Sequence, residues 1–177
     1  MVAQENFSFA TMTQPLEEGA NHGGRANKTG STLENTVEDL LVRNGYERTT
    51  ITDWPPQLPA GKRFYARQVK IGMSIYGSNR RMDFAIWGAK RFPNGLIIEC
   101  KWQQGSGSVD EKFPFSVLNI EKSKQDYGVP SVIIIDGGGY KESALDWLKG
   151  QVNELGGLQD VFSLNEFIRE VNNSYLK

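Results

Sequence analysis

The first regular pattern along the chain is helical. From Leu33 to Leu41, apolar residues recur at the three- and four-residue spacing of a single helix face. Ser31 and Glu34 fit a capping box at the start of this stripe, and Gly45 follows its end. The pattern predicts a helix that begins at Ser31. Residues 1–30 show no sustained period and predict a loosely ordered N-terminal arm.

Four strands are predicted after this helix. Alternate residues over 65–75 are mainly apolar, which is typical of a strand with one buried face. Two further apolar runs, 82–87 and 96–102, are separated by a turn at 92–95, so the three strands predict an antiparallel meander. Residues 132–135 are wholly apolar and precede an aspartate and three glycines, as expected of a buried strand with a tight turn.

Helical patterns also occupy 115–127, 141–154 and 165–173, the last with Ser163 and Glu166 in capping-box positions. The predicted order is αβββαβα with a further terminal helix. This order predicts an α/β (α+β) fold with a mixed central sheet flanked by helices. Residues 31–177 are expected to form one domain.

Three ionisable residues are predicted to converge on the second and third strands. If the loop between them is symmetric about Arg91, Asp83 faces Glu99, and strand alternation places Lys101 on the same face. Two carboxylates about 5 Å apart repel each other unless a cation lies between them. Mg²⁺ would supply that charge, with the backbone carbonyl of Cys100 as a third oxygen ligand. The alternative is a surface sheet face on which Lys101 pairs with one carboxylate.

Such a centre fits phosphodiester hydrolysis. The metal would activate a water molecule, and Lys101 would orient that water or stabilise the phosphorane. These residues resemble the PD-(D/E)XK nuclease superfamily, whose core order is αβββαβ and whose motif is an Asp followed by Glu-x-Lys on the next strand. The match is Asp83, Glu99 and Lys101, with Met82 in place of the family's proline. The resemblance covers roughly residues 31–147.

The resemblance implies further site residues. The family often adds an acidic residue from the first helix, which implies Glu34 as a fourth catalytic group, with Glu38 one turn later as the fallback. The alternative role of Glu34 is to cap the backbone of Ser31. The segment after Lys101, including Gln103, resembles one in type II restriction endonucleases, so Gln103 is a secondary candidate.

The distribution of basic residues along the chain predicts a surface that binds DNA. The chain carries a net charge of −1, but residues 60–91 contain eight basic residues and a single acidic one, Asp83. A basic band beside the site would bind phosphates in a salt-dependent way. The alternative is that these are solvated strand and turn residues. The candidates for DNA contact are Arg80, Arg81, Arg67, Lys70, Lys122 and Lys124.

Composition excludes several other classes. The 177 residues are 38% hydrophobic, enough for a single core. Cys100 and His22 are the only cysteine and histidine, which argues against a disulfide, a Cys/His zinc site and a Cys-His nucleophile. No apolar run approaches the ~20 residues that span a bilayer, and no signal peptide is apparent. We therefore expect a cytoplasmic protein without a membrane partner.

The sequence thus predicts a DNA endonuclease that uses Mg²⁺, with Mn²⁺ as a substitute, and that is nearest to type II restriction enzymes. Cleavage of both strands by subunits with one site each predicts a homodimer. A structure-selective nuclease similar to Holliday junction resolvases is the first alternative. A DNA-binding module without catalysis is the second.

Overall fold

The centre of the fold is a mixed sheet. The structure is a computed structural model that describes residues 22–52, 54–105 and 107–177. In these residues six strands lie in the order β1-β2-β3-β4-β5-β6. They are β1 (Tyr46–Arg48), β2 (Arg63–Met73), β3 (Asn79–Trp87), β4 (Leu96–Trp102), β5 (Ser131–Asp136) and β6 (Leu158–Ser163). Strands β2, β3 and β4 are antiparallel and the other neighbours are parallel, which confirms the mixed sheet.

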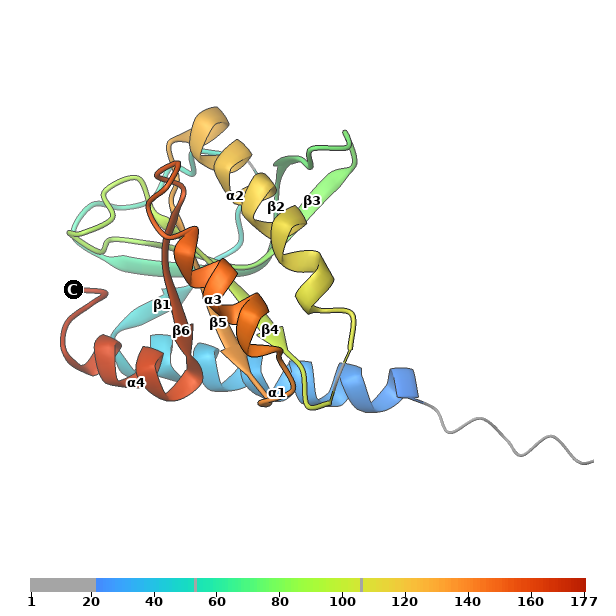
Figure 1. The fold of residues 1–177 in the computed structure, drawn as a ribbon. Coiled ribbons are helices and arrows are strands. Elements are labelled where there is room, and N and C mark those ends of the chain that lie inside the picture. The colour runs from blue at the N-terminus through green and yellow to red at the C-terminus, as the bar shows by residue number, and fades with distance from the viewer. Residues whose placement is uncertain (1–21, 53, 106) are drawn as a thin grey trace, which may run out of the picture.

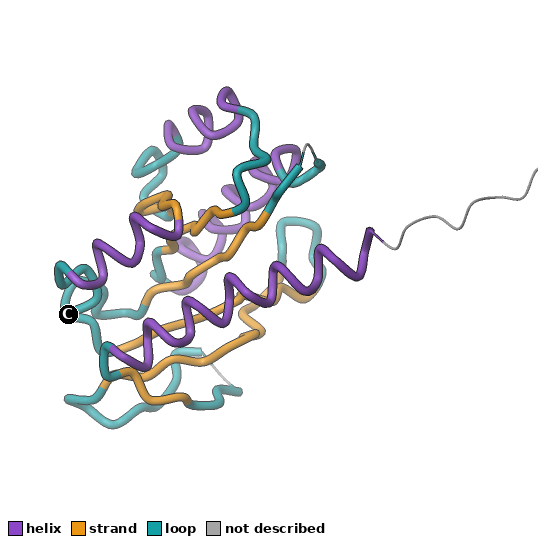
Figure 2. The backbone as a smooth tube through the Cα atoms, turned by 90° about the horizontal axis from the view of Figure 1, so that it is seen from below, coloured by secondary structure: helices purple, strands orange, loops and turns teal. Residues whose placement is uncertain are grey.

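Helices cover both faces of the sheet (Figure 1). They are α1 (His22–Arg43), α2 (Phe113–Tyr127), α3 (Glu142–Gly150) and α4 (Leu164–Asn172), and a short 3-10 turn, Asp110–Lys112, precedes α2. The apolar stripe of α1 packs with α4 against one face of the sheet, while α2 and α3 pack on the other. Figure 2 shows α1, the long helix next to the grey trace, lying over the sheet in roughly the same direction as the strands. The predicted arrangement of helices around a central sheet is confirmed.

The predicted register between β3 and β4 is also confirmed. The ladder pairs are Phe84–Ile98, Ala85–Ile97 and Ile86–Leu96, and the numbers of each pair add up to 182. The apolar run of β5 is explained by burial on both faces, because Ile133 and Ile134 belong to clusters on opposite sides of the sheet.

The predicted start of the first helix, and with it the predicted end of the N-terminal arm, is wrong. Helix α1 begins at His22, so Ser31 lies inside it and does not form the predicted capping box. Within a helix, backbone N–H groups bond to the preceding turn, and glycines in the 22–30 segment lower helix propensity by only about 1 kcal/mol each without breaking it. The rest of the predicted arm, residues 1–21, lies outside the described residues. Strands β1 and β6 were not predicted, since β1 has only three residues and β6 shows neither a clear alternation nor a wholly apolar run.

The alternation predicted over 65–75 is interrupted at Gln68. This residue has a φ of 54°, in the left-handed region that few side chains other than glycine adopt. Before it, Tyr65 packs in the α1 cluster, whereas Val69 after it packs in the cluster on the opposite face. The same change occurs on β3, where Met82 shares the cluster of Val69 and Phe84 lies under α1. The backbone irregularity therefore lies directly beside Asp83.

Candidate active site

The candidate site lies where β3 and β4 separate. Their ladder ends at Phe84–Ile98, and Asp83, Glu99 and Lys101 follow directly beyond that pair. Asp83 is not a ladder partner of Glu99, which corrects the predicted direct opposition. Instead, Asp83 Oδ2 accepts a hydrogen bond of 2.8 Å from the backbone N–H of Cys100. This hydrogen bond favours the ionised form of Asp83, against the repulsion from Glu99.

Glu99 is a buried carboxylate between two cations. Its side chain is 7% exposed, and Lys101 Nζ donates to Oε2 at 2.8 Å while Arg80 Nη2 donates to Oε1 at 3.3 Å. Burial alone would raise the pKa of Glu99, but the charges of Lys101 and Arg80 outweigh it and lower this pKa. Glu99 is therefore ionised at neutral pH.

Lys101 is the only one of the three motif residues with a cationic side chain. Burial opposes its charged form, but the carboxylates of Glu99 and Asp83 outweigh burial and raise the pKa of Lys101. The side chain nevertheless keeps 22% of its surface exposed. The Lys101 side chain is thus partly accessible to solvent.

Asp83 titrates differently from Glu99. Burial first, and then the charge of Glu99, raise the pKa of Asp83 from 3.8 to about 6. The influence of Glu99 and Lys101 on this group shows that the three motif residues act on one another electrostatically. The structure therefore brings the predicted trio together, although not as a ladder pair.

The raised pKa predicts that ionised Asp83 destabilises the folded protein. The folded state holds this proton more strongly than the unfolded state between about pH 4 and 6, so stability falls as pH rises through that window. We expect Asp83→Asn to be more stable than the parent at pH 8, by up to roughly 3 kcal/mol. The gain should vanish near pH 4.

Urea unfolding in EDTA at both pH values measures this difference. Asp39→Asn, on an exposed part of α1, is the matched control and should show no such pH-dependent gain. A gain for Asp83→Asn that is the same at pH 4 and pH 8 would contradict the assignment.

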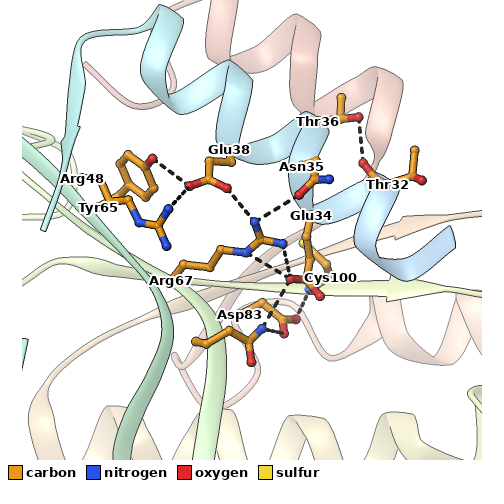
Figure 3. Close-up of polar contacts among 11 residues, drawn as sticks. Thr32, Glu34, Asn35, Thr36, Glu38, Arg48, Tyr65, Arg67, Asp83 and Cys100 are labelled. Atoms are coloured by element: carbon orange, nitrogen blue, oxygen red, sulfur yellow. Dashed lines mark hydrogen bonds and ion pairs between the residues drawn. The ribbon is translucent and has the colours of Figure 1, made fainter. Parts of the chain in front are cut away.

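Glu34 extends toward Asp83 from α1 (Figure 3). The side-chain amide of Gln68 lies between them, with Nε2 at 3.3 Å from Asp83 Oδ1 and 3.4 Å from Glu34 Oε2. Arg67 Nη2 also donates to Glu34 Oε2, at 2.8 Å. Of the two predicted helix acids, Glu34 is thus the one connected to Asp83. Sequence reasoning missed Gln68, because its placement depends on a left-handed backbone that the pattern does not indicate.

Glu38 is committed to a neighbouring polar network instead. It accepts hydrogen bonds from Tyr65 Oη at 2.8 Å and from Arg67 Nη1 at 2.6 Å, and it lies 3.5 Å from Arg48 (Figure 3). The fallback role of Glu38 as a metal ligand has no support in this geometry. Glu38 accepts a hydrogen bond from Arg67, and Arg67 in turn donates one to Glu34, so the network fixes the position of the Glu34 side chain.

Two of the predicted DNA-binding residues have other partners, which corrects their assignment. Arg67 is bound between Glu34 and Glu38. Arg80 is 9% exposed and donates to Glu99, to the backbone carbonyl of Asn119 and to Ser123 Oγ. The strand pattern did not distinguish them from solvated residues, because their acceptors come from helices distant in sequence.

The remaining basic candidates are on or near the surface. Arg81 and Lys70 are exposed. On α2, Lys122 pairs with Asp126 at 2.8 Å, and Lys124 Nζ donates to the carbonyl of Gly128 at 3.3 Å. Arg81 is the best placed of the four, because it lines a cleft beside Glu99 and Lys101.

This cleft has a volume of about 510 Å³. Its lining includes Glu99, Cys100 and Lys101 on β4, Arg81 on β3, and Phe115 on α2. Asp83 is not among the lining residues, so the cleft reaches the site from the side of Glu99 and Lys101.

Gln103 shapes the loop beside the cleft. Its Nε2 donates to Asp110 Oδ1 at 3.1 Å and to the carbonyl of Gly139 at 2.9 Å, and its Oε1 accepts from the N–H of Val109 at 2.9 Å. The side chain is buried, so its role here is to hold the loop. At Gly137, φ is 103° and a Cβ would lie 2.5 Å from the carbonyl of Gln103, which explains the glycines of the predicted tight turn.

The donor chemistry of the site fits a hard divalent cation. Asp83, Glu99 and the Cys100 carbonyl offer oxygen ligands, and Mg²⁺ commonly uses one or two carboxylates and keeps several waters. Within the described ranges, no group of three or more His, Cys, Asp or Glu side chains could enclose a metal. The arrangement therefore suits an open site rather than a closed protein cage.

Comparison with known proteins finds a match to a protein family. A family model described as "PD-(D/E)XK nuclease superfamily domain" matches residues 25–175. No curated protein and no solved structure matches. Over the part of the chain that the structure describes, no helix has the length and apolar character to cross a bilayer.

Proposed function

Because the chain belongs to the PD-(D/E)XK nuclease superfamily, we propose that it is a metal-dependent endonuclease that hydrolyses phosphodiester bonds of DNA. The observation that carries this proposal is the ion pair of Glu99 and Lys101, beside Asp83, at the end of the β3–β4 ladder. The alternative of an ordinary surface salt bridge does not fit, because Glu99 is buried and bound by two cations, Lys101 and Arg80. The cleft at Lys101 supplies the access that a substrate requires.

Asp83, Glu99 and the carbonyl of Cys100 would hold the ion, which we take to be Mg²⁺ with Mn²⁺ as a substitute. When bound, such an ion lowers the pKa of water and neutralises charge that develops on a phosphate. Glu34 would add a further carboxylate from α1, in a position set by Arg67 and Gln68.

Besides the bound metal ion, the ammonium group of Lys101 is a second positive charge for the reaction. The water oxygen forms a bond to phosphorus and gives up a proton to solvent, the bond to the leaving ester oxygen breaks, and that oxygen takes up a proton from solvent. Negative charge grows on the non-bridging oxygens meanwhile, and an ammonium group placed at the cleft stabilises it. Arg80, which is largely buried, helps Lys101 to keep Glu99 ionised.

At the level of substrate, the first candidate is cleavage of duplex DNA by a homodimer, in the manner of type II restriction endonucleases. A structure-selective nuclease of the junction-resolving kind is the second candidate, and the exposed aromatic pair described below favours it. The proposed function does not depend on which of these substrates is preferred.

Incubation with supercoiled plasmid, linear DNA and a four-way junction, in Mg²⁺ or in EDTA, tests the proposed function. We expect cleavage in Mg²⁺ that EDTA abolishes and that Asp83→Ala lowers by at least about a hundredfold. Circular dichroism of the variant checks that it is folded. If Asp83→Ala cleaves as fast as the parent, the proposed site is wrong. If no substrate is cut in Mg²⁺ or Mn²⁺ but DNA is retained at low salt, a binding module replaces the nuclease.

A further inference from the structure

Large apolar side chains gather at one exposed place beside the cleft. Tyr76, in the turn between β2 and β3, is 79% exposed and stacks on Phe115 of α2, with ring centroids 5.2 Å apart and planes inclined by 21°. Met73, Ile75 and Leu118 are exposed around this pair. Such a concentration on a protein surface marks an interaction site.

The aromatic pair is held firmly in relation to the candidate active site. Asn119 of α2 accepts a hydrogen bond from the N–H of Ile75 through Oδ1, at 2.9 Å, and its carbonyl accepts one from Arg80. Arg80 in turn binds Glu99. The hairpin that carries Tyr76 is therefore tied through α2 and Arg80 to a motif carboxylate, and Figure 1 shows this hairpin beside α2.

The surroundings of the pair favour a polyanion as its partner. Phe115 lines the same cleft as Glu99 and Lys101, and the other charged lining residues, Arg80, Arg81 and Lys112, are all basic. A second copy of the chain fits less well. At a two-fold interface the same patch faces itself, which would bring Arg81 and Lys112 near their own counterparts.

We infer that Tyr76 and Phe115 form a stacking platform for a nucleobase next to the scissile phosphate. Bases within a duplex are already stacked, so a flat exposed ring contacts a base only where the strand is unpaired or easily unstacked. The preferred substrate is therefore DNA with unpaired nucleotides near the cleaved bond. This inference rests on the proposed nuclease function and specifies its substrate class.

Fluorescence anisotropy with labelled oligonucleotides tests the inference. Binding is measured in Ca²⁺ in place of Mg²⁺, to slow cleavage, for a duplex, a single strand and a duplex with a central bubble. We expect the two unpaired forms to bind more tightly than the duplex, and Tyr76→Ala or Phe115→Ala to weaken them by roughly tenfold. Tyr76→Phe keeps the ring and should retain binding. Trp147→Ala, an exposed aromatic on α3 that does not line the cleft, is the matched control.

A second readout reports stacking directly. A 2-aminopurine base in the single strand should lose fluorescence on binding to the parent protein and recover it with Tyr76→Ala. Equal weakening on all three DNA forms, or none, would overturn the inference, as would sedimentation showing that Tyr76→Ala separates a dimer into monomers. Mg²⁺-dependent cleavage by the parent would leave the proposed function standing in each of these cases. Failure to bind or cut any DNA would overturn both.

Discussion

Lys101→Met is expected to reduce the rate of DNA cleavage by about 10²- to 10³-fold while the protein stays folded. The substitution keeps most of the apolar stem of the side chain and removes the ammonium that lies 2.8 Å from Glu99 Oε2. It thereby deletes the cation that we propose stabilises charge on the phosphate. Single-turnover cleavage in saturating Mg²⁺ measures the loss, because this regime isolates bond breaking from product release.

Two further variants make this test specific. Lys149→Met removes an exposed lysine from α3 and should leave cleavage unchanged. Lys101→Arg keeps the charge but not the geometry of the amine, so we expect partial activity between that of the parent and that of Lys101→Met. Cleavage by folded Lys101→Met at a rate within a few-fold of the parent would exclude the proposed role of Lys101.

Arg80→Ala is expected to lower the free energy of unfolding by about 3–5 kcal/mol. The change leaves Glu99 buried with Lys101 as its remaining ion-pair partner, and it removes the donor to the Asn119 carbonyl and to Ser123 Oγ. Loss of this charge should also raise the pKa of Glu99. Equilibrium urea unfolding in EDTA measures the change in stability.

The adjacent residue offers a matched control. Arg81→Ala removes an identical side chain from the next position of β3, but that side chain is exposed and lines the cleft. Its free energy of unfolding should stay within about 0.5 kcal/mol of the parent. Equal stability losses for the two variants would contradict the buried role of Arg80.

Much of the fold could be predicted because the relevant signals are local. The apolar runs of β3 and β4 and the turn between them are enough to set the register, since a hairpin's pairing follows from its loop. The same register brought Asp83 close to Glu99 and Lys101. The capping box of Ser163 and Glu166 was also predicted correctly, because its hydrogen bonds span only three residues.

The chemistry around that trio was decided by contacts between distant segments. Arg67 and Arg80 are basic residues on strands, and the sequence alone allowed both to face DNA. Carboxylates from α1 capture Arg67, while Glu99 and α2 capture Arg80. A charged side chain that is buried needs a partner, and the partner is chosen by packing rather than by neighbours along the chain.

The sequence by itself thus determined the order of the core elements, the β3–β4 register and the motif Asp83, Glu99 and Lys101. Tertiary structure alone decided which cations neutralise the motif, that Gln68 reaches both Glu34 and Asp83, and that Tyr76 stacks on Phe115 beside the cleft. The physical reason is the distance along the chain over which each kind of interaction acts. Periodicity, turns and caps act over a few residues, whereas burial and charge pairing depend on which surfaces meet when the sheet and helices pack.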